Sequence, residues 1–119
     1  MATRTWDRID TPLDGSEFQV WKMAGVAAGD TLATLLVASF SDKTIYFLKV
    51  SAFGGDVALT GQPAPGALFV TLKEPDGTAI SGKTSDGAFT CLQHSYGIQP
   101  TVGAGVSGVD IYAVCSSTR

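Results

Sequence analysis

Apolar and polar residues alternate along most of this chain in short runs, and turn-forming residues separate the runs. The clearest run is Thr44 to Val50; Gly54-Gly55-Asp56 and a second alternating run, Val57 to Thr60, follow it. Alternation with a period of two is typical of β-strands. A Gly-Gly or Gly-Asp pair between two such runs is a strong signal for a β-hairpin. We therefore predict that the two runs are adjacent strands joined by a tight turn.

The rest of the chain repeats this pattern. The segment 31–40 could be a helix or a strand by its apolar spacing, but its β-branched residues favour a strand. Further strands are predicted at Phe18–Met23, Ala67–Leu72, Thr78–Ser81, Ala88–Leu92, Ile98–Val102 and Val109–Ser116. Many short strands with closely spaced turn signals indicate an all-β fold, namely an antiparallel β-sandwich or β-barrel of about eight or nine strands.

The first residues of the chain do not share the pattern. Residues 1–16 contain Pro12, Asp14 and Gly15 without periodicity, and they are predicted to form an irregular N-terminal arm. Residues 17–119 are predicted to form a single β domain, because 119 residues suffice for one core. The arm carries Trp6, which could pack on its own sheet or reach a neighbouring subunit.

Alternation also divides each strand into two faces. In the run from Thr44, the side chains of Tyr46, Leu48 and Val50 lie opposite Lys49 and Ser51, so we predict that these three face the core. The same reasoning, applied to the other strands, gives a candidate core of Tyr46, Leu48, Val50, Val57, Leu59, Phe89, Cys91, Val109, Ile111 and Cys115.

Ile45 and Phe47 then fall on the face opposite the predicted core. Two large apolar groups there imply that either a second layer of the same chain or another subunit covers them. The candidate protein–protein interface consists of Trp6, Trp21, Met23, Ile45 and Phe47. If this interface exists, the substitution Phe47→Asp should leave a folded protein that fails to assemble.

Composition narrows the classes of partner. Hydrophobic residues make up 45% of the chain and charged residues only 16%, so part of the surface could be apolar and reserved for a protein partner. The net charge of −3 and the dispersed basic residues argue against nucleic acid. No apolar run reaches the roughly 18 residues of a membrane helix. The polar start lacks a secretory signal, so we expect synthesis in a cytosol and no membrane partner.

Catalytic chemistry has little support in the sequence. A triad would need His94, the only histidine, with Asp86 or Asp110 as orienting group and Ser95 or Cys91 as nucleophile. None of these residues lies in a known nucleophile motif. We therefore expect no enzyme activity, no catalytic residues, no metal site and no cofactor.

The only two cysteines, Cys91 and Cys115, fall on predicted inward faces. Both are interpreted as small buried core residues. The sequence does not decide whether they form a disulfide bond, because it does not give the distance between their Cα atoms.

Several segments together resemble small proteins that are encoded among the head genes of tailed bacteriophages. The matching segments are TWDRIDTP, VAAGDTLATLLVASFSDKTIYFLKVSAFGGDVALTGQ, FVTLKEPDGTAIS and YGIQPTVGAGVSGVDIYAV, which cover most of the chain. The chain departs from this group at residues 62–66, QPAPG, where a different turn is expected. The resemblance implies a structural virion protein, specifically a decoration or cement protein that binds the outside of the capsid and stabilises it.

This resemblance also implies partners and a location. We expect the protein on the capsid surface of the virion, bound to the major capsid protein and assembled as a homo-oligomer, with a trimer preferred. One alternative is another virion component, such as a tail, adaptor or head-fibre piece. The other is a free-standing carbohydrate- or ligand-binding β module, for which Trp21, Tyr96 and Tyr112 are candidate contacts.

Overall fold

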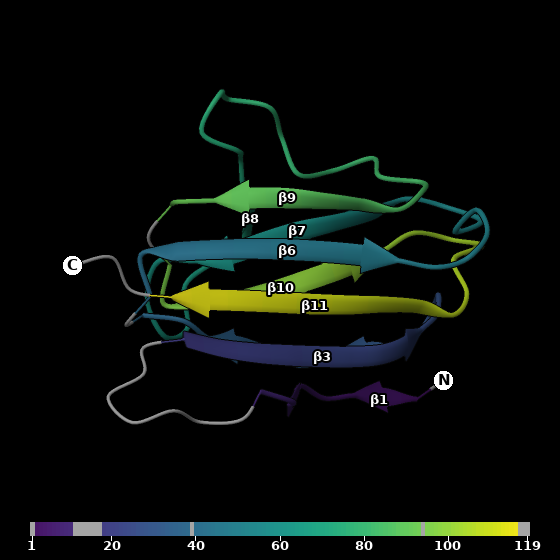
Figure 1. Cartoon of the computed structure of the whole chain (residues 1–119), viewed down its shortest axis with the longest axis horizontal. Coiled ribbons are helices and arrows are strands. Elements are labelled where there is room, and N and C mark those ends of the chain that lie inside the picture. Colours follow the sequence, from purple (N-terminus) through teal and green to yellow (C-terminus); the bar gives the residue numbers. More distant parts are fainter. Residues whose placement is uncertain (1, 11–17, 39, 94, 117–119) are drawn as a thin grey trace.

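The computed structural model describes residues 2–10, 18–38, 40–93 and 95–116, and their regular structure consists of β-strands (Figure 1). The larger sheet has the order β2 (Asp7–Arg8), β3 (Phe18–Val26), β11 (Val109–Ser116), β6 (Asp42–Leu48) and β9 (Gly87–Cys91). The smaller sheet has the order β5 (Leu35–Leu36), β10 (Gly97–Val102), β7 (Val57–Gln62) and β8 (Val70–Thr71). A further pair joins β1 (Thr3–Arg4) to β4 (Thr31–Leu32). The predicted all-β sandwich is confirmed, and the sheets do not close into a barrel.

Strand β11 is the centre of the larger sheet. It pairs antiparallel with β3 on one side and with β6 on the other. Its inward side chains include Val109, Ile111 and Cys115, and each of them is fully buried. The sequence predicted both the bounds of this strand and its buried face, because its alternation is unbroken.

The buried face of strand β6 is the opposite of the one predicted. Ile45 and Phe47 are fully buried between the two sheets, whereas Tyr46 and Leu48 are half-buried on the outer side. Val50 lies beyond the strand and is completely exposed. The assignment of Tyr46, Leu48 and Val50 to the core was therefore wrong. The assignment of Ile45 and Phe47 to an interface was wrong as well, since their own chain covers them.

Two residues explain this inversion. Lys49 was used to define the polar face, but β6 ends at Leu48, so the alternation does not extend to Lys49. Within the strand, Lys43 has the same parity as Ile45 and is only 1% exposed. Lys43, which belongs to β6, thus points into the core. Lys49, which suggested the solvent side, lies beyond the end of the strand.

The predicted hairpin between residues 44–50 and 57–60 is also wrong. Strand β6 belongs to the larger sheet and β7 to the smaller one, so residues 49–56 cross from one sheet to the other. Phe53 is fully buried in this crossing. Its N–H donates to the Thr84 carbonyl, 3.0 Å away, and its carbonyl accepts from Ser107. Burial of Phe53 therefore decided the path of residues 49–56, although their turn residues alone suggested a tight hairpin.

The described part of the N-terminal arm lies on its own domain. Strand β2 extends the larger sheet beside β3, and the indole N–H of Trp6 donates to the Ala33 carbonyl at 3.0 Å. Asp30 accepts hydrogen bonds from the Arg4 guanidinium at 2.8 Å and from the Ala2 N–H at 3.0 Å. The bond from Arg4, aided by backbone N–H donors, lowers the pKa of Asp30 to about 2. Trp6 therefore packs against its own core.

Lys43 is the most unusual core residue, because it lies between Cys91 of β9 and Cys115 of β11. Neighbouring strands are about 4.8 Å apart, so the two cysteines, with β6 between them, lie about 10 Å apart, beyond the roughly 7 Å limit for a disulfide. Both cysteines are free. The amino group of Lys43 donates to the Phe40 carbonyl at 3.4 Å.

We expect the substitution Lys43→Met to leave the free energy of unfolding unchanged or to raise it by about 1–2 kcal/mol. Methionine keeps most of the volume and removes a polar group whose burial is costly. In contrast, Lys43→Ala should lower the free energy of unfolding by about 2 kcal/mol, because it leaves a cavity. Urea denaturation of the three proteins measures the difference. A large loss of stability in the methionine variant would show that the amino group itself stabilises the fold.

Candidate interaction surface

The side of the larger sheet that faces away from the core carries aromatic and aliphatic side chains. Here the term outer face denotes Val20, Lys22, Thr44, Tyr46, Leu48, Ala88, Thr90, Asp110, Tyr112 and Val114, which share the outward parity on β3, β11, β6 and β9. Across its middle, Tyr112 lies between Lys22 and Tyr46 in register. The outer face therefore combines aromatic and aliphatic groups and remains only partly covered by the chain itself.

Two charged residues of the outer face, Lys22 and Asp110, lie close to each other. Asp42 at the start of β6 and Asp7 on β2 share the outward parity. The Lys22 amino nitrogen is 3.9 Å from an Asp110 carboxylate oxygen and 5.3 Å from the centre of the Tyr112 ring. A hydrogen bond and electrostatic attraction from Tyr112, followed by the attraction of Asp110, raise the pKa of Lys22. Asp110 also accepts the Gly25 N–H at 2.9 Å. A partner that covers this part of the face would thus bury Lys22 and Asp110 as a pair.

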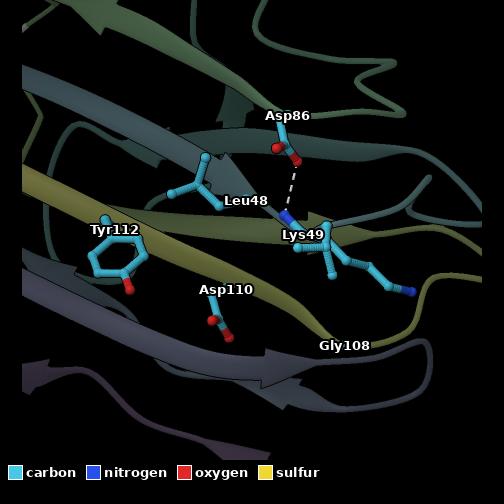
Figure 2. A pocket seen from close by; sticks show the side chains of 7 residues that line it. Leu48, Lys49, Asp86, Gly108, Asp110 and Tyr112 are labelled. Carbon is cyan, nitrogen blue, oxygen red and sulfur yellow. Dashed lines mark hydrogen bonds between the residues drawn. The ribbon is translucent and has the colours of Figure 1, made fainter.

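A shallow hollow of about 480 Å³ lies at one end of the outer face. Figure 2 shows the residues that line it, namely Leu48, Lys49, Val50, Asp86, Gly108, Asp110 and Tyr112. The Asp86 carboxylate accepts the backbone N–H of Lys49 at 2.8 Å, and the Lys49 amino group donates to the Ser107 hydroxyl at 3.2 Å. The hollow is open to solvent, so its shape suits the contact of another surface more than the enclosure of a small substrate.

The residues considered for catalysis include Cys91, which is buried in the core together with Cys115. Burial raises the pKa of the Cys91 thiol and raises that of Cys115 to about 11, so both thiols are protonated and poorly nucleophilic at neutral pH. His94 lies outside the described residues. Among the residues that the structure describes, no cluster of three or more His, Cys, Asp and Glu could hold a metal ion. No helix in the described part of the chain is long and apolar enough to span a membrane.

The residues predicted to form an interface do not share one surface. Met23, Ile45 and Phe47 are fully buried in the core. Trp6 and Trp21 are half-buried and pack against that core. The Trp21 indole N–H donates within the chain, to the Gln19 side-chain oxygen at 3.0 Å. Placing Met23, Ile45 and Phe47 at a surface was therefore wrong.

Sequence reasoning missed most of the apolar residues that are exposed. Among the residues that the structure describes, the large exposed ones are Ile9, Leu36, Val50, Leu68, Phe69, Val70 and Leu92. Three of them are consecutive, and the stretch from Gln62 to Leu72 contains no charged residue. That absence of charge was the available signal, but a short apolar run is equally typical of a buried strand.

This fold occurs in solved structures. The crystal structure of the SPBc2 prophage-derived protein YomS is similar, with a TM-score of 0.65 and 9% sequence identity. The alignment covers 92% of this chain and 99% of that chain. At this identity the likeness shows a shared fold. No protein-family model matches the chain, and the comparison with curated proteins finds no match.

Proposed function

We propose that this protein is a structural component of a tailed-bacteriophage particle and that it acts as a decoration protein on the outside of the capsid. The fold is that of a protein derived from a prophage. The sequence segments described above resemble phage head-gene products. The observation that carries the proposal is the outer face, whose aromatic and aliphatic groups lie beside the ion pair of Lys22 and Asp110.

Docking through the outer face is physically favourable. Tyr46 and Tyr112 are amphipathic and rigid, and tyrosine is enriched among the residues that dominate protein–protein binding energy. Lys22 and Asp110 are paired with each other, so burial would not leave an isolated charge. In this proposal the partner is the major capsid protein, and contacts that bridge neighbouring capsid subunits stabilise the shell.

The test is binding to capsids that lack the protein. Purified protein is mixed with such capsids of the phage that encodes it, and co-sedimentation measures the bound copies. We expect saturable binding of the wild type and at least about a tenfold loss of affinity for Tyr46→Asp, because the interface would bury an unpaired carboxylate.

The matched control for this test is Ala64→Asp. It introduces the same charge at an exposed position outside the outer face and should bind like the wild type. Wild-type protein that does not bind, or a Tyr46→Asp variant that is folded and binds normally, would contradict docking through the outer face.

A further inference from the structure

The N-terminal arm closes one side of the sandwich, and Figure 1 shows it along the lower edge of the view, below β3. Its strand β1 pairs in parallel with β4, and its strand β2 pairs antiparallel with β3. Each of these two arm strands has only two residues. The arm is thus joined to the domain by two short and separate strand pairs.

The arm adds little to the core. Every residue from 2 to 10 is exposed or half-buried, and none of them is fully buried. The large side chain of Trp6 packs against the core, whereas Ile9 is 50% exposed. Segments with few buried apolar contacts open at a lower free energy than the whole domain. Release of the arm would therefore leave the packing between the two sheets in place.

The first half of the arm, residues 2–6, is hydrogen-bonded to the segment 31–33. The Thr31 N–H donates to the Ala2 carbonyl at 2.9 Å, and the Ala33 N–H donates to the Arg4 carbonyl at 3.0 Å. In the opposite direction, the Trp6 indole N–H donates to the Ala33 carbonyl. The amides of Thr31 and Ala33 therefore report whether this half is in place, because its removal would expose both to water.

Asp30 bonds to the same half of the arm with both of its carboxylate oxygens. Oδ1 accepts the Ala2 N–H at 3.0 Å, and Oδ2 accepts the Arg4 Nε–H at 2.8 Å. Oδ2 also accepts the Ala27 N–H at 3.0 Å, so a bond within the domain fixes the position of the carboxylate. The Asp30 side chain is only 5% exposed. Because charge-assisted hydrogen bonds are roughly twice as strong as neutral ones, Asp30 holds residues 2–6 more firmly than the backbone bonds of β1 do.

The second half of the arm, residues 7–10, is attached elsewhere. The Ile9 N–H donates to the Val20 carbonyl at 2.9 Å, and the Asp10 carboxylate accepts the Val20 N–H at 2.9 Å. Arg8 donates to the same carboxylate, also at 2.9 Å. This attachment to β3 uses none of the groups that hold residues 2–6. The first half can therefore detach while the second half stays on β3.

We propose that residues 2–6 form a strap that opens and closes on the folded domain, and that Asp30 is the latch that holds this strap closed. Opening separates β1 from β4, withdraws Trp6 from the core and frees the backbone N–H groups of Thr31 and Ala33. Strand β2 stays paired with β3 and serves as the hinge. The strap is a conformational device on one side of the sandwich, and it does not depend on a role in the capsid.

Amide hydrogen exchange of the whole chain, measured residue by residue with NMR and corrected for intrinsic rates, tests the strap and its latch. Asp30→Ala removes both acceptor oxygens, whereas Arg4→Met removes one donor and spares the bond from Ala27 to Asp30. The matched control is Asp10→Ala, which removes the carboxylate that holds the second half. The N–H of Ala113, on the central strand β11, reports unfolding of the whole domain.

In the wild type, we expect the N–H groups of Thr31 and Ala33 to exchange at least about tenfold faster than that of Ala113, because a strap opens more often than the domain unfolds. Asp30→Ala and Arg4→Met should each accelerate exchange at Thr31 and Ala33 by a further factor of about ten, with no change at Ala113. Asp10→Ala should accelerate exchange at Val20 instead.

Three results would overturn the proposal. Wild-type amides of Thr31 and Ala33 that are protected as strongly as Ala113 would show that residues 2–6 open only with the whole domain. Unchanged exchange at Thr31 and Ala33 in both Asp30→Ala and Arg4→Met would show that there is no latch. An equal effect of Asp10→Ala at Thr31 and Ala33 would show that the two halves do not open separately. No capsid is involved, so a failure of the strap is distinguishable from a failure of the decoration role.

Discussion

The substitution Phe47→Asp is expected to abolish folding and to give insoluble or unfolded protein. Phe47 is fully buried between the sheets, and its ring centre lies 5.4 Å from that of Phe89. Loss of a buried phenylalanine side chain costs about 3–5 kcal/mol, and a buried, unpaired carboxylate adds several more. The sum is comparable to the whole stability of a domain, about 5–15 kcal/mol. Circular dichroism and soluble yield measure the effect.

The neighbouring residue provides the control for this prediction. Tyr46 is half-buried on the outer face, so Tyr46→Asp should lower the free energy of unfolding by only about 1–2 kcal/mol. That variant should remain folded and lose capsid binding. A folded Phe47→Asp protein, together with an unfolded Tyr46→Asp protein, would show that the faces of β6 are reversed.

The second large effect is expected at Gly54. Its φ is +89°, and a Cβ atom there would collide with the carbonyl oxygen of Gly105. The substitution Gly54→Ala should therefore combine a left-handed backbone cost of about 1–2 kcal/mol with a packing cost of about 1–3 kcal/mol. We expect the free energy of unfolding to fall by about 3 kcal/mol or more, as measured by urea denaturation.

Gly77 separates the two contributions. Its φ is +91°, and a Cβ atom there would meet nothing within 4 Å. Gly77→Ala should therefore lose only the backbone contribution of about 1–2 kcal/mol. Equal losses at Gly54 and Gly77 would show that the close approach of the two loops does not limit the substitution.

Local signals in the sequence were sufficient to predict features that lie within one strand or one turn. The bounds and buried face of β11 followed from alternation alone. The residues Glu74-Pro75-Asp76-Gly77 are likewise typical of a tight turn, and the Gly77 N–H donates to the Glu74 carbonyl at 2.9 Å. Such features depend on neighbours in the chain, so a single sequence contains them.

The candidate surface could not be obtained in the same way. Apolar residues occur on both sides of β6, and the structure places Ile45 and Phe47 in the core and Tyr46 and Leu48 on the outer side. Which set is buried depended on Lys43, whose direction is fixed by pairing with β9 and β11. Pairing partners far away in the sequence are not contained in the alternation of one strand.

The sequence by itself determined that this protein is an all-β domain with short strands and a low content of charged residues, and it determined the bounds and buried face of β11. Only the tertiary structure decided that residues 49–56 cross between sheets, that Phe47 faces inward and that β8 ends the smaller sheet. The physical reason is that a period of two defines two faces of a strand but does not show which of them is buried. The buried face depends on which sheet each strand joins. At the crossing, burial of Phe53 outweighs the local turn preference of Gly54 and Gly55.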